Sequence, residues 1–176
     1  MHTLIVGERQ VGKSTLIRRV LQEIGCPVWG FETKKEDGLA DETGGCPLYI
    51  YEAGRPHVRS AENLAGYCRD EKPVGYVQAF DRFAGKLADP PTGCVVLMDE
   101  LGKMEAASGP FTQAVMRLLD GDTPVIAAVK DKPSPFLDAV RNHPRCRCYR
   151  ITKENRDALY EVVLCAVKCA VAQEYE

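Results

Sequence analysis

The sequence lacks a long hydrophobic run, a leader-like N-terminus and a strong excess of charge of either sign. No stretch approaches the roughly 20 apolar residues that a membrane-spanning helix needs, and the chain enters an apolar strand without a basic region or cleavage site. The formal net charge of -2 gives no electrostatic basis for binding nucleic acid or an anionic membrane. We therefore expect a cytoplasmic protein that binds neither.

Cysteine is plentiful, with 8 residues, but the C-x-x-C pairs typical of a zinc site are missing. Cys146 and Cys148 lie on an expected strand, and Cys165 and Cys169 on an expected helix, at spacings that place each pair on one face. We expect reduced thiols packed in the core, because cysteine is among the most buried residue types. A metal or disulfide role is the alternative.

Apolar periodicity predicts strands that alternate with helices. The expected strands cover residues 3–6, 27–33, 94–98, 124–129 and 146–151, and the expected helices cover 16–24, 76–87 and 110–120, with two more beginning near Ser134 and at Thr152. This alternation is typical of an α/β three-layer sandwich, in which helices cover both faces of a mostly parallel sheet. The composition, 45% hydrophobic over 176 residues, suits one domain spanning residues 1–176.

One segment interrupts the alternation. Residues 47–51 form a β-rich aromatic run bounded by Gly-Gly and Ala-Gly, which predicts an antiparallel hairpin insertion with residues 57–59 as a return strand.

A glycine-framed segment between the first strand and the first helix carries the main functional signal. Residues 7–15 read GERQVGKST and match the phosphate-binding pattern G-x-x-x-x-G-K-[ST]. Glycines allow the loop to curl so that backbone N–H groups and the positive helix end face one phosphate. Lys13 would reach the β- and γ-phosphates, and Ser14 would complete the shell of a bridging Mg²⁺. The candidate nucleotide-binding residues here are Gly7, Glu8, Arg9, Gln10, Val11, Gly12, Lys13, Ser14 and Thr15.

Two carboxylates end the buried strand at 94–98. Ligands of open α/β sheets bind beyond the carboxyl ends of the strands, so Asp99 and Glu100 are expected near the phosphate loop. Asp99 is placed to hold the Mg²⁺, and Glu100 to activate the water that attacks a γ-phosphate. The alternative for Glu100 is a cap or a solvated turn residue.

Four segments together resemble one family. They read GERQVGKST (7–15), WGFET (29–33), VLMDELGKME (96–105) and ITKENRD (151–157). In order and spacing they are similar to the P-loop nucleoside-triphosphatase family that includes thermophilic archaeal and bacterial enzymes and the human cancer-related NTPase. The resemblance implies slow, Mg²⁺-dependent hydrolysis of ATP, GTP and other nucleoside triphosphates to diphosphate and phosphate. It also implies that the strand ending at Val129 lies between the loop strand and the Asp99 strand.

The resemblance extends to further site residues. Lys103 would neutralise transition-state charge, or else pair with Glu105 or Asp99. Asn155 and Arg156 would meet the base or ribose, with helix capping and a surface charge as the alternative. Thr33 would approach the γ-phosphate. Members of the family usually carry Thr-Ile-Pro after the strand that ends here at Val129, whereas this chain has Lys130, Asp131 and Lys132, which add positive charge at the ligand end.

Three functions remain open at this stage. A hydrolase is favoured, because a water-activating carboxylate serves hydrolysis. A small nucleoside or nucleotide kinase would share the loop but needs an acceptor pocket and usually an arginine-bearing lid, for which Arg55, Arg59 and Arg82 are available. A nucleotide-binding switch is the third. We expect a monomer, and no protein partner is identifiable.

Overall fold

The computed structural model describes residues 1–70 and 72–173, and its centre is one sheet with the strand order β5-β4-β3-β2-β6-β7-β1-β8. The strands are β1 (His2–Gly7), β2 (Val28–Lys35), β3 (Cys46–Glu52), β4 (Leu64–Arg69), β5 (Lys72–Gly75), β6 (Val95–Leu101), β7 (Val125–Lys130) and β8 (Cys146–Arg150). The helices are α1 (Lys13–Ile24), α2 (Val77–Ala84), α3 (Gly109–Asp120), α4 (Pro135–Arg141) and α5 (Arg156–Gln173).

The parallel half of the sheet positions the functional loops. β2, β6, β7, β1 and β8 pair in parallel, with β7 between β6 and β1. The expected strand order is therefore confirmed. Because the carboxyl ends of parallel strands share one edge, the segments that follow β1, β6 and β7 lie together there.

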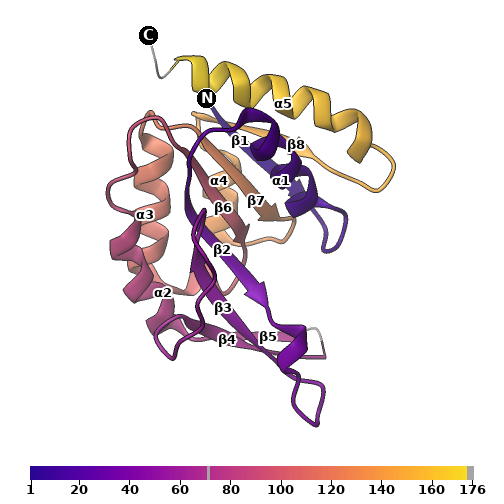
Figure 1. Cartoon of the computed structure of the whole chain (residues 1–176), viewed down its shortest axis with the longest axis vertical. Helices are drawn as coiled ribbons and strands as arrows, with labels where there is room; N and C mark the ends of the chain where they lie inside the picture. The colour runs from indigo at the N-terminus through magenta and orange to yellow at the C-terminus, as the bar shows by residue number, and fades with distance from the viewer. Residues whose placement is uncertain (71, 174–176) are drawn as a thin grey trace.

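Helices cover both faces of the sheet, which confirms the three-layer α/β arrangement. Figure 1 shows α1 and α5 together on one side, with α2 and α3 on the other. Central strands are buried on both faces, so they are apolar throughout; all residues of β7 except Lys130 are buried. Among the residues that the structure describes, no helix has both the length and the hydrophobicity to cross a membrane.

Three phenylalanines form the centre of the core under α2 and α3. The ring centroid of Phe111 lies 5.0 Å from that of Phe31 and 5.4 Å from that of Phe80, both in edge-to-face geometry. All three side chains are fully buried. The rings join β2, α2 and α3, so this cluster holds the helical layer against the strand that precedes the site.

The antiparallel half differs from the prediction. β2 pairs with β3, and the meander continues through β4 and β5. The expected return strand at 57–59 is wrong, because these residues belong to the loop before β4. β4 reads LAGYCR, and its small residues give little strand signal. Glycine is needed at Gly66, since an added Cβ would lie 2.3 Å from the carbonyl oxygen of Val74.

The last helix begins later than expected. α5 starts at Arg156 instead of Thr152. Residues 152–155 form a turn, in which the Thr152 N–H donates to Asn155 Oδ1 at 2.8 Å and the Asn155 N–H donates to Thr152 Oγ1 at 3.3 Å. The Thr152 hydroxyl therefore caps this turn and not the first turn of α5. The reciprocal bonds between Thr152 and Asn155 compete with the backbone hydrogen bonds of a helix, so the helix begins later.

The cysteines divide into two groups. All are free thiols, and Cys46, Cys68 and Cys94 are buried. We expected the strand cysteines 146 and 148 and the helix cysteines 165 and 169 to pack in the core. This prediction is wrong at three of the four positions, because Cys148, Cys165 and Cys169 are exposed. The reason is topological: β8 is an edge strand, and α5 turns one face to solvent.

We predict that Phe111→Ala lowers the free energy of unfolding by about 3–5 kcal/mol, because it removes a buried ring and leaves a cavity between two others. Urea denaturation measures the loss. Val162→Ala, at a side chain that is 52% exposed, is the control and should change stability by less than about 0.5 kcal/mol. Equal effects of the two substitutions would show that the ring cluster is not the centre of the core.

Candidate active site

The loop between β1 and α1 depends on glycine at two positions. An added Cβ at Gly7 would lie 2.7 Å from the carbonyl oxygen of Ile151, so only glycine fits beside that strand end. Gly12 has a φ of 106°, a conformation that side chains disfavour, and it directly precedes the first residue of α1. The loop thus turns sharply into the N-terminus of α1, where backbone N–H groups and the helix dipole favour an anion.

Lys13 links the loop to the end of β6. Its side chain is only 4% exposed, and Nζ donates to the backbone oxygens of Gly7 at 3.0 Å and Glu8 at 2.6 Å. Nζ also lies 3.1 Å from Glu100 Oε2. The Lys13 amine is therefore held by the backbone of the phosphate loop and faces Glu100, the other candidate catalytic residue.

Two more contacts complete the cluster. Ser14 Oγ donates to Asp99 Oδ1 at 2.9 Å, and Lys130 Nζ lies 3.1 Å from Glu100 Oε1. Glu100 therefore sits between two ammonium groups and is not a free surface carboxylate. The structure brings together residues that stand far apart in the sequence, at the carboxyl ends of β1, β6 and β7.

Burial changes the acidity of two carboxyl groups near the site. It raises the pKa of Asp99 to about 6, although the hydrogen bond from Ser14 opposes the shift. It also raises the pKa of Glu105 to about 7. Glu105 is 2% exposed, and its Oε2 accepts from the Gly102 N–H at 2.9 Å. Glu105 therefore fixes the turn after β6.

A cavity of about 500 Å³ opens beside Gly7 and Glu100. Its far side is formed by the antiparallel strands and by the segment after β6. We call it the loop cavity, and its lining residues include Thr33, Lys35, Leu48, Lys103, Met104 and Lys132. The Thr33 Oγ1 is buried there without a hydrogen-bond partner among the residues that the structure describes.

The remaining predicted residues lie at different places around the loop. Glu8 and Arg9 line the loop cavity, as does Lys103. Val11 packs in the core under α1 and α5. Asn155 uses both ends of its amide on the backbone, since Nδ2 donates to the Arg150 oxygen at 2.9 Å and Oδ1 accepts from Thr152. The Arg156 Cδ lies 3.8 Å from the position of a Cβ on Gly12, beside the phosphate loop.

The alternative reading of Lys103 is not supported by the contacts. The structure shows no ion pair between Lys103 and either Glu105 or Asp99 within residues 1–70 and 72–173, and Lys103 is exposed at the loop cavity. Its amine is therefore available to an anion there.

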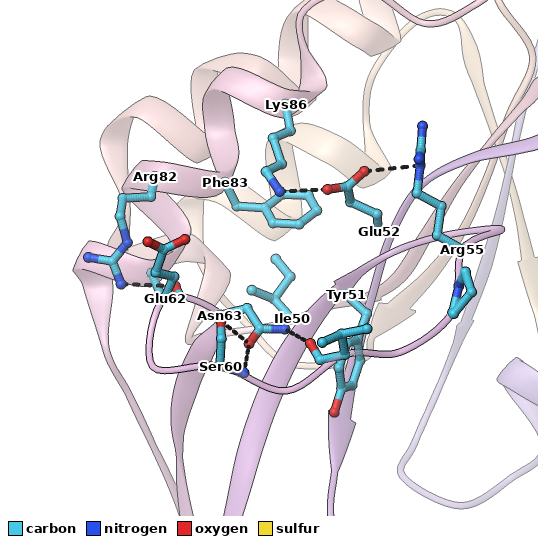
Figure 2. A pocket seen from close by; sticks show the side chains of 13 residues that line it. Ile50, Tyr51, Glu52, Arg55, Ser60, Glu62, Asn63, Arg82, Phe83 and Lys86 are labelled. Atoms are coloured by element: carbon cyan, nitrogen blue, oxygen red, sulfur yellow. Dashed lines mark hydrogen bonds and ion pairs between the residues drawn. The ribbon is translucent and has the colours of Figure 1, made fainter.

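Two of the three arginines considered for a lid, Arg55 and Arg82, line a separate cavity of about 350 Å³ between β3, the 53–63 loop and α2. The third, Arg59, does not line it and pairs with Glu36 at 3.9 Å. Figure 2 shows that Arg55 meets Glu52, which also pairs with Lys86, while the Arg82 guanidinium donates to the Glu62 carbonyl oxygen. We call this the α2 cavity. Among the residues that the structure describes, the two cavities share no lining residue.

Comparisons with known proteins show the family of the chain. A family model described as NTPase matches residues 2–164. The chain belongs to this NTPase family. A cancer-related nucleoside-triphosphatase homolog of Mus musculus is 31% identical, with 95% of this chain and 96% of the relative covered. The cancer-related nucleoside-triphosphatase of Homo sapiens is 30% identical, with 93% and 95% covered.

Solved structures of two NTPase family members share the fold. The crystal structure of THEP1 from Aquifex aeolicus has a TM-score of 0.70 at 24% sequence identity, covering 95% of this chain and 99% of that one. The solution structure of a human cancer-related nucleoside triphosphatase has a TM-score of 0.67 at 25% identity, covering 96% and 97%. The antiparallel extension and the loop cavity thus occur within an NTPase fold.

Sequence reasoning missed two kinds of residue in this NTPase. Lys130 was noticed only as extra charge, because nothing in its own segment indicates that it pairs with Glu100. Leu48 and Cys68 were not considered for the site, and both line the loop cavity. Their role depends on how the antiparallel strands pair, which the local pattern did not reveal.

We predict that Glu105→Gln weakens the pH dependence of stability. The pKa of Glu105 is raised from 4.5 to about 7 in the folded state. The stabilisation of the folded state by the proton on Glu105 is therefore complete below pH 4.5 and is lost as the pH rises through 7. The reason is that the folded state holds this proton more tightly than the unfolded state does. Between pH 5 and 8 the melting temperature of the wild type should fall at least about 3 °C further than that of the variant.

Thermal melts without added metal measure this difference, and Glu42→Gln at an exposed position is the control, with a pH profile parallel to the wild type. A Glu105→Gln profile parallel to the wild type would contradict the account of the buried carboxyl group.

Proposed function

We propose that this protein hydrolyses nucleoside triphosphates, ATP and GTP among them, to the diphosphate and phosphate in a Mg²⁺-dependent reaction. The observation that carries the proposal is the position of Glu100, which is held between Lys13 and Lys130 and lines the loop cavity. A carboxylate at that place, next to a phosphate-binding lysine, is suited to accept a proton from water near the γ-phosphate. The names of the relatives, nucleoside-triphosphatases, support the same reaction.

The chain's own residues fit a Mg²⁺ ion. Mg²⁺ prefers oxygen ligands and in nucleotide sites takes one or two protein oxygens besides phosphates and water. Ser14 Oγ and Asp99 Oδ1 are 2.9 Å apart, so hydroxyl and carboxylate oxygens meet beside the phosphate loop. Ser14 and Asp99 would hold the ion, which when bound neutralises charge on the β- and γ-phosphates.

The residues divide the reaction between them. The loop and the start of α1 hold the triphosphate by backbone N–H groups and the helix dipole. Lys13 turns its amine to the β- and γ-phosphates and stabilises the charge that develops on the leaving oxygen. Water attacks the γ-phosphorus, its proton passes to Glu100, and the bond from the γ-phosphorus to the bridging oxygen breaks, which leaves the nucleoside diphosphate. Lys103 and Lys130 add positive charge around the transferred phosphoryl group.

The residues near the start of α5, beside the phosphate loop, bear on which nucleotide bases the protein accepts. Asn155 bonds to the backbone of its own turn through its side-chain amide. This leaves Arg156, beside Gly12, as the candidate contact for base or ribose. A guanidinium can stack on any base, which supports broad substrate use.

Hydrolysis is tested by phosphate release from ATP, GTP, CTP and UTP with Mg²⁺ and no acceptor. We predict release from all four and none after chelation of the metal. If no triphosphate gave phosphate under these conditions, the hydrolase proposal would fail, and a switch or a transferase would remain.

We predict that Glu100→Gln lowers kcat by about 10² or more while the affinity for the triphosphate stays close to that of the wild type, because the amide cannot accept the proton. Lys13→Ala is the matched comparison and should weaken affinity and turnover together, because Lys13 binds the phosphates directly. Single-turnover hydrolysis and calorimetric titration with a non-hydrolysable analogue measure the two quantities. Loss of binding in Glu100→Gln would show that the carboxylate is structural.

A further inference from the structure

The loop cavity extends beyond the space that a triphosphate needs. Of the phosphate loop, only residues 7–9 line it; the residues at the start of α1, where the α- and β-phosphates lie in such sites, do not. Its other walls come from β2, β3, β4, β5, the end of β6 with the segment after it, and residues 130–132 at the end of β7. A volume of about 500 Å³ is within the range of sites for small organic ligands. The γ-phosphate would occupy one end.

The charges in the loop cavity leave two cations available. Glu100 is paired with Lys13 and Lys130, and Asp131 with Arg150. Lys103 and Lys132, both exposed, make no side-chain hydrogen bond or ion pair within the described residues. Glu8 stands at the phosphate-loop end. Two unpaired amines at the rim favour an anion there.

The interior of the cavity is mixed in character. Leu48, Pro73 and Met104 give it apolar walls. The Thr33 hydroxyl is buried and, among the described residues, has no partner, although buried polar groups are hydrogen-bonded in most folded proteins. The Thr33 oxygen has almost no exposed surface, so a ligand in the cavity does not reach it. The apolar walls and the cationic rim match a ligand that carries an apolar body and a negative charge.

We propose that the loop cavity binds an organic phosphate beside the triphosphate, with its phosphate at Lys132 and at Lys103, whose amine would then lie between this phosphate and the γ-phosphoryl group. The proposal rests on the proposed function in one respect: the triphosphate fills the phosphate loop. A nucleoside monophosphate and a sugar phosphate share this chemistry, and the test distinguishes them. The α2 cavity differs, because its cations Arg55, Arg82 and Lys86 already have partners.

The test is calorimetric titration of the protein saturated with Mg²⁺ and a β,γ-imido triphosphate. The probes are adenosine monophosphate, ribose 5-phosphate, phenyl phosphate and inorganic phosphate. We expect saturable 1:1 binding of at least one organic phosphate, with a Kd below about 1 mM, and at least tenfold weaker binding of inorganic phosphate. The proposal is overturned if no organic probe binds, or if inorganic phosphate binds as tightly as the best of them.

Charge variants give a matched comparison. Lys132→Ala should weaken binding of the organic phosphate about tenfold, because it removes an unpaired amine from the rim. Arg55→Ala removes a paired cation from the α2 cavity and should leave both this affinity and the rate of phosphate release unchanged. Equal losses in the two variants would indicate general attraction of anions and would overturn the assignment to the loop cavity.

The experiment separates the two proposals. The imido triphosphate is titrated first, and its failure to bind would count against the proposed function alone. The organic phosphates are then titrated against the free protein, where the cavity proposal still requires saturable binding that Lys132→Ala weakens. Transfer of a labelled γ-phosphoryl group to the bound organic phosphate would support the site and identify its occupant as an acceptor.

Discussion

The position of β7 between β1 and β6 is the constraint on which the site depends. It sets the distance between the phosphate loop after β1 and the two carboxylates near the end of β6, and side chains span that distance. Ser14 reaches Asp99, and Lys13 reaches Glu100. A different strand order would leave the same motifs in the chain but too far apart to act on one triphosphate. The order of the buried apolar strands therefore determines the geometry of the site as much as the motif residues do.

Electrostatics at this edge of the sheet are balanced rather than simply positive. Glu100 has an ammonium group on each side, and burial raises the pKa of Asp99 to about 6. A triphosphate with its metal would change both environments, because it brings a cation to Asp99 and offers Lys13 an anion other than Glu100. The ion pairs of Lys13 and Glu100 would thus hold the loop in shape in the free protein and change partners when a triphosphate binds.

The sequence predicts the parallel half well, because its signals are local. The glycine-framed loop, the apolar strand that ends at Asp99 and the glycine stop of α1 each act through neighbouring residues, and Gly25 does adopt a φ of 70° there. The antiparallel half is different, because pairing of β4 and β5 depends on distant partners and on small residues such as Gly66. For the same reason the ion pair of Lys130 with Glu100 and the position of Leu48 in the loop cavity could be found only from the structure.

The central claim is that water activated at Glu100 attacks the γ-phosphorus of a bound nucleoside triphosphate. The most direct measurement is a single turnover with Mg²⁺ in water enriched in ¹⁸O, followed by mass spectrometry of both products. We predict that one ¹⁸O atom enters the inorganic phosphate and none enters the nucleoside diphosphate. Label in the diphosphate, or formation of monophosphate and pyrophosphate, would show that another bond is broken and would contradict the account.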